Sequence, residues 1–267
     1  MGELLKIVTT KLASHIDVPL FRKLAKSDSV DNEHVPLVLF IQKCFSLIYV
    51  ISRVRGYKAI LKYFPHDVGK VEELEVLLKF FTMPVSQAYS ILRKGVEDEN
   101  FSTVTSTSAN GQINRFACKS TFDSEPWHVE CAGGLWLSIA ILAPFHLSIL
   151  DSGEEEERIE ERIRVWCQSG IVDGFREGSP TLVSSITLLS KLLARPDMEN
   201  QLSMFLHWAL CLLNRKTNEN FHAIESIAKI LPTSSATSIQ KTNILLSVAS
   251  IYKSVPRKSN VAQRMYK

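Results

Sequence analysis

The sequence predicts an all-α fold, a string of helices joined by short connectors, and three observations support this prediction. Apolar residues recur almost everywhere at i, i+3, i+4 and i+7, the spacing that places side chains on one helix face. Strand signals are scarce along the chain. Residues typical of helix ends separate the periodic segments. Helices of about 10–20 residues with short connectors are typical of helical bundles or of an α-solenoid of stacked helix pairs.

The N-terminal part of the chain, residues 1–94, is predicted to consist of helical repeats. Its periodic segments are short at first, and one long apolar segment follows them. The predicted helical segments are residues 4–14, 19–25, 35–54, 61–64 (the end of a short element), 67–80 and 84–94. Residues 1–94 are therefore the first of three predicted parts.

A polar segment interrupts this pattern at residues 95–127. It is rich in Ser, Thr, Asn and Gly and has no sustained apolar period. Long connections without secondary structure are uncommon inside compact domains, so we expect a long loop or an insertion here. Further helical repeats of the same solenoid are expected over residues 128–267.

Four apolar stripes predict four helices in the last third of the chain. Helix-start signals accompany them, because Ser179-Pro180 pairs an N-cap residue with proline at the first helical position, and Thr237 precedes Gln240 at capping-box spacing. The stripes are Leu182, Ile186, Leu189 and Leu193; Met198, Leu202, Phe205, Ala209 and Leu212; Phe221, Ile224, Ala228 and Leu231; and Ile244, Val248 and Ile251.

An acidic run, Glu154–Glu157, is predicted to open another helix. Carboxylates in a first turn complement the positive end of the helix dipole. Within that helix, Glu154 with Arg158 and Glu160 with Arg164 have i,i+4 spacing. We expect both pairs on a solvated helix face.

The most apolar stretch of the chain is Cys131–Leu150, which contains no Asp, Glu, Lys or Arg. Its length is about that needed to cross a bilayer. Two glycines and Pro144 interrupt it, and acidic residues flank it. We therefore expect a buried central helix, with a membrane-embedded protein as the alternative. Trp136 in this stretch is expected in the core, as are Trp166 and Trp208.

Composition and motifs exclude several classes of function. Net charge is +3, with Lys and Arg spread along the chain, which argues against nucleic-acid binding. Walker, HExxH, GxSxG and GxGxxG motifs are absent, so no enzyme activity and no cofactor are predicted. The odd number of cysteines without a CxxC motif indicates a reducing compartment. They are Cys44, Cys118, Cys131, Cys167 and Cys211.

Two histidines lie in patterns that could suggest chemistry. His66 and Asp67 follow Pro65, where a turn and a helix N-cap are a better explanation than an acid–base pair. His128 and Cys131 have metal-like spacing, but a zinc site needs about four ligands and no second pair is evident. No catalytic residue and no metal ligand is predicted.

One cluster of basic residues is a candidate binding surface. Arg53, Arg55, Lys58 and Lys62 flank a Gly-Tyr pair at Gly56. These cations could meet an acidic partner and raise its association rate. The structural explanation is a helix–turn–helix corner, in which the glycine ends one helix and the cations lie near its C-terminus. The structural explanation is favoured, and the four residues are kept as partner-binding candidates.

Several sequence blocks resemble the tubulin-folding cofactor D family. They occur in the order found in that family, from about residue 35 onward. Members of the family are several times longer, so the chain corresponds to an N-terminal portion, and the segment at residues 95–127 is longer than expected. The blocks are residues 54–58 (VRGYK), 64–68 (FPHDV), Trp127, 135–138 (LWLS), Pro144-Phe145, Leu150-Asp151, 192–197 (LLARPD), 205–208 (FLHW) and, more weakly, 261–266.

The resemblance implies a HEAT/armadillo-type α-solenoid and a cytoplasmic, cytoskeleton-associated tubulin chaperone. It implies that the protein captures β-tubulin and helps join it to α-tubulin. The implied partners are the sibling cofactors E and C and a small Arf-like GTPase. GTP hydrolysis on tubulin would be stimulated only together with those partners, and no membrane span is expected. A generic HEAT-type scaffold for another protein cargo is the alternative.

Overall fold

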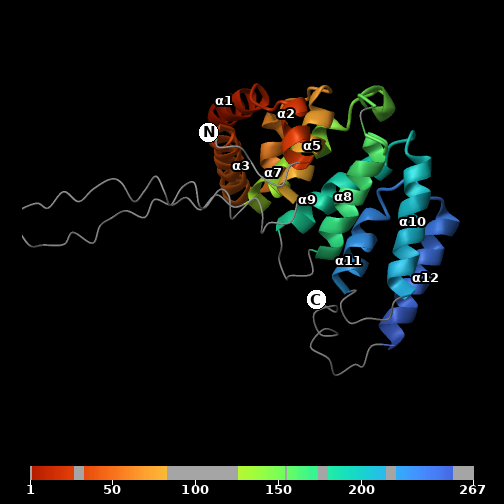
Figure 1. Cartoon of the computed structure of the whole chain (residues 1–267). Helices are drawn as coiled ribbons and strands as arrows, with labels where there is room; N and C mark the ends of the chain where they lie inside the picture. The colour runs from red at the N-terminus through yellow and green to blue at the C-terminus, as the bar shows by residue number, and fades with distance from the viewer. Residues whose placement is uncertain are drawn as a thin grey trace, which may run out of the picture. The chain divides into compact units, whose positions relative to one another are not determined.

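The computed structural model describes residues 2–26, 33–82, 126–153, 155–173, 180–214 and 221–254. Every regular element in these ranges is a helix, which confirms the all-α prediction for the described part of the chain (Figure 1). The predicted helix at residues 84–94 and the polar segment up to residue 125 lie outside the described residues. The division at residues 94 and 127 therefore stays a prediction.

The chain forms two compact units. Unit 1 comprises Met1–Pro65 and Val76–Gly133, and unit 2 comprises His66–Glu75 and Gly134–Lys267. Two helices, α5 (Lys70–Thr82) and α7 (Pro126–Ala140), contribute residues to both units.

Unit 1 is organised around its longest helix, α3. The predicted helices at residues 4–14, 19–25 and 35–54 are confirmed to within two residues at each end. Helix α1 packs on α3 and on the 3-10 helix η1, and α3 packs on α4. The bounds are α1 (Gly2–Ala13), α2 (Val18–Lys26), α3 (Val35–Arg55), α4 (Tyr57–Ile60) and η1 (Leu61–Tyr63).

Helix α3 is long and apolar enough, by length and composition, to cross a membrane, and among the described helices it alone passes that test. Its burial follows the pattern of a core helix. Val38, Ile41, Phe45 and Ile48 repeat at helical spacing, and each is fully buried. Lys43 on another face is exposed. This one-sided burial accounts for the apolar composition of α3.

Unit 2 contains η2 and helices α8 to α12, together with its parts of α5 and α7. Helix α8 packs along α9, α9 also contacts α11, and α10 packs on α12 (Figure 1). The predicted stripe on α10 faces the core, since Phe205 and Ala209 are fully buried. The predicted stripe on α9 is confirmed in part, because Leu189 and Leu193 are buried and Leu182 and Ile186 are half-buried. The bounds are η2 (Leu147–Ile149), α8 (Ile159–Asp173), α9 (Pro180–Leu193), α10 (Glu199–Asn214), α11 (Phe221–Ile230) and α12 (Ser238–Ser254).

The apolar stretch Cys131–Leu150 is not one continuous helix. Helix α7 ends at Ala140, and a turn and η2 follow it. The predicted buried helix is confirmed for the α7 part, where Trp136 is fully buried. Gly134 explains one of the interruptions: a Cβ atom there would lie 3.0 Å from the Trp166 ring and 3.1 Å from Ser184 Cβ. The glycine permits this close packing. The two other tryptophans expected in the core, Trp166 and Trp208, are half-buried.

The predicted start of the helix after Asp151 was wrong. Helix α8 begins at Ile159, so the described acidic residues 155–157 precede it. The backbone N–H of Ile159 donates to Asp151 Oδ2 at 2.9 Å, so a carboxylate eight residues earlier satisfies one of the unpaired donors of the first turn. The acidic residues in the first turn are Glu160 and Glu161.

The solvated face predicted for this helix was also wrong. Glu160 and Arg164 are both buried, because α8 packs against α9 and α10. Arg164 donates to Gln201 Oε1 on α10 at 2.8 Å and to Gln168 Oε1 at 2.6 Å. Its ion pair is with Glu161 at 3.2 Å, at i,i+3 spacing. A polar network thus replaces the expected exposed Glu160–Arg164 pair. Glu154 of the other predicted pair lies outside the described residues, so that pair stays a prediction.

The capping box at the start of α12 is confirmed. The backbone N–H of Gln240 donates to Thr237 Oγ1 at 3.3 Å, and the backbone N–H of Thr237 donates to Gln240 Oε1 at 2.8 Å. These reciprocal bonds satisfy two donors that the helix itself leaves unpaired.

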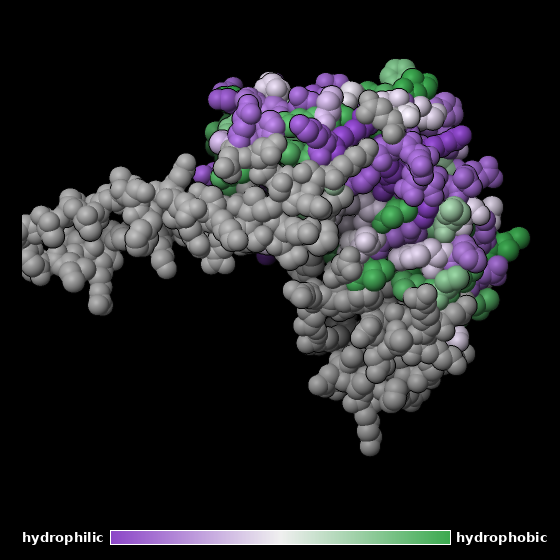
Figure 2. All heavy atoms as spheres, viewed as in Figure 1, coloured by the Kyte–Doolittle hydropathy of each residue, from purple (hydrophilic) through white to green (hydrophobic). Residues whose placement is uncertain are grey.

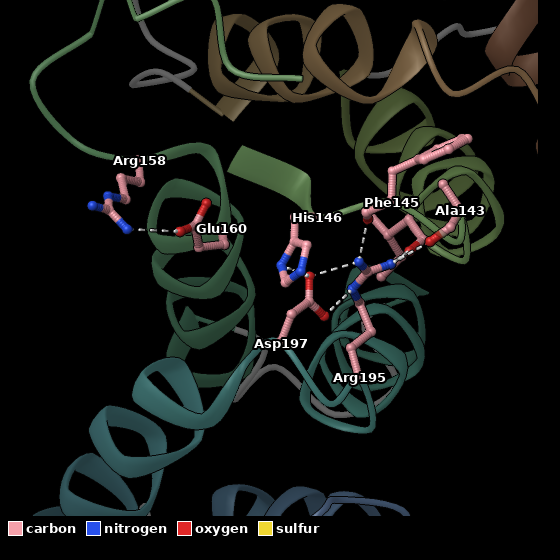
Figure 3. A network of polar contacts seen from close by, with 8 residues as sticks. Ala143, Phe145, His146, Arg158, Glu160, Arg195 and Asp197 are labelled. Carbon is pink, nitrogen blue, oxygen red and sulfur yellow. Dashed lines mark hydrogen bonds and ion pairs between the residues drawn. The ribbon is translucent and has the colours of Figure 1, made fainter. Parts of the chain in front are cut away.

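Arg195 holds together the corner between the end of α7 and the α9–α10 turn (Figure 3). Its guanidinium donates to the carbonyls of Ile141, Ala143 (2.8 Å) and Phe145 (2.6 Å), in the turn that follows α7. It also forms a two-pronged ion pair with Asp197, with N–O distances of 2.9 and 2.7 Å. A planar guanidinium suits this geometry because it offers five donors in a fixed arrangement.

The Asp197 carboxyl makes the stability of this corner depend on pH. Burial alone would raise its pKa, but the hydrogen bonds and charge of Arg195, with the charge of His146, hold the pKa below its ordinary value. The folded-state pKa is therefore lower than the unfolded-state pKa. The resulting stability is fully present above the unfolded-state value and is lost as the pH falls through the folded-state value.

We expect the difference in unfolding free energy between wild type and Arg195→Met to shrink as the pH falls from about 5 to about 3. Protonation of Asp197 removes the charge partner that the arginine holds. Urea melts of both proteins across this range measure the difference. A difference that stays constant would show that Asp197 does not titrate against Arg195.

Candidate partner-binding surface

The four basic candidates are all exposed at one helix corner of unit 1. Arg53 and Arg55 lie in the last turn of α3, Lys58 lies in α4 and Lys62 lies in η1. Gly56 separates α3 from α4 with φ +81°, a conformation that side-chain-bearing residues rarely adopt. The predicted helix–turn–helix corner is therefore confirmed. We call the four cations the basic corner.

The basic corner also borders a hollow that the sequence did not reveal. This corner hollow has a volume of about 290 Å³ and combines cations with apolar side chains. Leu5, Ile51 and Ile60 are its buried apolar residues, while Arg55 and Lys62 are exposed. Its lining is Gly2, Leu5, Ile51, Arg55, Ala59, Ile60, Lys62 and Tyr63. Arg55 and Lys62 thus share this hollow, whose lining does not include Arg53 or Lys58.

The positive charge of the basic corner is not neutralised within the described residues. No ion pair there joins Arg53, Arg55, Lys58 or Lys62 to a carboxylate. The Lys62 ammonium lies 5.1 Å from the centroid of the Tyr63 ring, a cation–π distance. Exposed cations without local counter-charges can attract an acidic surface.

His66 and Asp67 precede α5 and its starting turn, as predicted, but Asp67 is not the residue that adjoins the helix, because α5 begins at Lys70 rather than at the predicted residue 67. The Asp67 carboxylate accepts from the Gly69 backbone N–H at 3.0 Å, and the Asp67 carbonyl accepts from the Lys70 N–H at 3.1 Å. Both residues are exposed. Their contacts are those of a helix-start turn and give no reason to assign acid–base chemistry.

His128 and Cys131 take part in packing inside unit 1. His128 Nδ1 lies 2.9 Å from the Ser46 hydroxyl, and the His128 ring stacks on Tyr49 with centroids 4.7 Å apart. Burial raises the pKa of the Cys131 thiol to about 12, so the thiol stays protonated at neutral pH. Among the described residues, no three His, Cys, Asp or Glu side chains gather in a way that could hold a metal ion.

A family model described as tubulin-specific chaperone D-like, ARM repeat, matches residues 3–213 of the chain. The chain belongs to this family. The match includes the basic corner, the Arg195 corner and every residue of the corner hollow except Gly2, and it confirms the predicted armadillo-type helical repeat fold. No solved structure matches the chain.

Over most of its length, the chain is similar to a relative named tubulin-specific chaperone D, from Dictyostelium discoideum. The two are 25% identical over 218 residues, which cover 67% of the chain and 14% of the relative. The chain therefore spans about one seventh of the length of that relative. The resemblance stated from the sequence blocks is confirmed.

The sequence patterns did not identify the residues that α1 contributes to the corner hollow. Gly2 and Leu5 are about fifty positions away from Arg55 and Lys62 in the sequence. The helical period of α1 marks Leu5 as a core-facing residue. No local signal identifies the helix that it packs against.

Proposed function

We propose that this chain is part of a tubulin-folding cofactor, and that it binds β-tubulin and assists assembly of the αβ-tubulin heterodimer and microtubule biogenesis. The match to the chaperone D-like family over residues 3–213 is the observation that carries this proposal. The protein acts by binding and is not itself an enzyme. Its place is the cytoplasm, in association with the cytoskeleton.

The partners of this function include the tubulin-folding cofactors E and C and a small Arf-like GTPase. Stimulation of GTP hydrolysis on tubulin requires these partners together. Burial raises the pKa of both Cys131 and Cys167, so neither of these two thiols is poised as a thiolate nucleophile.

The basic corner is the proposed contact with tubulin. Tubulin is strongly acidic, and the four exposed cations have no carboxylate partner within the described residues. The corner hollow adds an apolar surface between two of these cations, into which a side chain of the partner can insert. Charge on such a rim raises the association rate and makes binding sensitive to salt.

Reversing the charge of the basic corner should weaken tubulin binding by about tenfold or more. The variant replaces Arg53, Arg55, Lys58 and Lys62 with glutamate. Size-exclusion chromatography of the chain with native tubulin, at low and at physiological salt, measures co-elution. Wild type should co-elute with tubulin, less so at the higher salt, and the variant should elute alone.

The matched control reverses four exposed cations elsewhere, Lys11, Lys23, Lys43 and Arg158. It changes net charge equally and should retain co-elution. Equal loss in both variants would show a general charge effect and overturn the assignment of the basic corner. If the wild-type chain does not co-elute with tubulin at either salt concentration, the proposal that it binds tubulin is overturned. That result would favour a scaffold for another protein cargo.

A further inference from the structure

A second hollow, in unit 2, lies beside the Arg195 corner. Its volume is about 590 Å³, larger than that of the corner hollow. We call it the Lys191 hollow. It is formed by the turn after α7, the last turn of α9 and the α9–α10 connection. Its lining is Leu142, Ala143, Pro144, Phe145, His146, Lys191, Ala194, Arg195, Pro196 and Asp197.

Large apolar side chains border this hollow without being covered. Leu142 is 52% exposed and Phe145 is 54% exposed. Nearby Ile149 is 71% exposed. Hydrophobic residues also gather at the segment between α7 and α8 in the space-filling view (Figure 2). Apolar surface concentrated at a hollow is typical of a binding site.

Lys191 is a half-buried cation in the lining of the hollow. Its ammonium donates to the Ser138 hydroxyl at 3.2 Å, and Ser138 in turn donates to the Leu135 carbonyl. No ion pair joins Lys191 to a carboxylate within the described residues. Burial lowers the pKa of Lys191, and no neighbouring charge opposes that effect. A partly desolvated ammonium with only a hydroxyl partner can gain a charge-assisted hydrogen bond from an incoming anion.

The other charged groups around the hollow do not neutralise the positive charge of Lys191. Arg195 already donates to three carbonyls and to Asp197, and the Asp197 carboxylate lies between Arg195 and His146 (Figure 3). Asp197 is therefore compensated by its own neighbours. Its side chain is 8% exposed, so it presents little negative charge to an incoming ligand. Lys191 is the cation left for an outside partner.

We propose that the Lys191 hollow binds a peptide segment of a partner protein in which an acidic residue follows or precedes a large apolar residue. The apolar side chain fills the hollow against Leu142 and Phe145, and the carboxylate pairs with the Lys191 ammonium. The site is separate from the basic corner, and it does not depend on the tubulin-binding proposal. A partner could therefore be held at one site without occupying the other.

Two fluorescein-labelled peptides test this proposal. They differ only in one side chain, a glutamate carboxylate in one peptide and a glutamine carboxamide in the other. The acidic probe is GSGLEFGSG and the neutral probe is GSGLQFGSG. Fluorescence anisotropy titrations with the full chain should show the acidic probe binding about tenfold more tightly or more, as expected for a hydrogen bond between charged groups. Equal binding of the two probes, or no binding of either, would overturn the proposal.

Three variants then test whether the peptide binds in the Lys191 hollow. Lys191→Met should abolish the preference for the acidic probe, whereas Lys58→Met in the basic corner should leave the preference unchanged. Phe145→Ser should weaken both probes by a similar factor, because it removes apolar surface and no charge. Loss of the preference in Lys58→Met, or its persistence in Lys191→Met, would overturn the assignment to this hollow.

Discussion

Replacing Trp136 with alanine should lower the free energy of unfolding by about 3–5 kcal/mol. Trp136 lies in α7 and is fully buried, and it is the largest such side chain in the described part of the chain. Its removal deletes apolar contacts and leaves a cavity that the neighbouring helices fill only in part. Few other single substitutions remove as much buried surface.

Urea melts followed by circular dichroism measure this loss. Phe145→Ala is the matched control, because Phe145 is 54% exposed and its truncation should cost less than about 1 kcal/mol. Trp136→Phe keeps an aromatic ring and should give an intermediate loss, which preserves the test if the alanine variant does not fold. A loss below about 1 kcal/mol for Trp136→Ala would contradict its burial in the core.

The sequence predicted this core position because the relevant signals are local. Helical periodicity and the charge-free run around Trp136 mark α7, and the same periodicity predicts α3 to within a residue at its C-terminal end. The capping box at Thr237 is local in the same way. Such features depend on residues three or four positions apart, so the sequence alone contains them.

The errors concern contacts that are distant in sequence. Arg164 was expected in solvent, but it binds Gln201, thirty-seven positions away on α10. The start of α8 was misplaced because Asp151 caps it from eight residues upstream, a separation that no capping motif covers. A charged residue on a helix can face either solvent or a polar partner, and only the packing of α8 against its neighbours decides between them.

The candidate surfaces were predicted to different degrees. The cations of the basic corner cluster within ten residues, so the sequence indicated them. The Lys191 hollow joins the turn after α7 to residues about fifty positions later. Its members share no local pattern, and Lys191 by itself looks like any lysine near a helix C-terminus. That no carboxylate of the described residues forms an ion pair with it becomes evident only from the three-dimensional arrangement.

Replacing Arg195 with methionine should lower the free energy of unfolding by about 3–5 kcal/mol, comparable to the effect of Trp136→Ala. Arg195 and Asp197 have side chains that are 10% and 8% exposed. Methionine keeps the apolar stem but leaves a buried carboxylate and the carbonyls of Ala143 and Phe145 without this donor. Breaking a buried pair by removing one partner is costly, because the remaining charge is not compensated.

The control and the companion variants distinguish this mechanism from general loss of charge. Arg158→Met removes an arginine whose side chain is 77% exposed and should change stability by less than about 0.5 kcal/mol. Arg195→Lys keeps the charge but offers no planar set of donors, so it should recover only part of the loss. Adding Asp197→Asn to Arg195→Met should cost little further, since the buried charge is then gone. Fully additive losses in urea melts of the single and double variants would contradict a coupled Arg195–Asp197 pair, and the stability of the corner would then have to come from the carbonyl contacts alone.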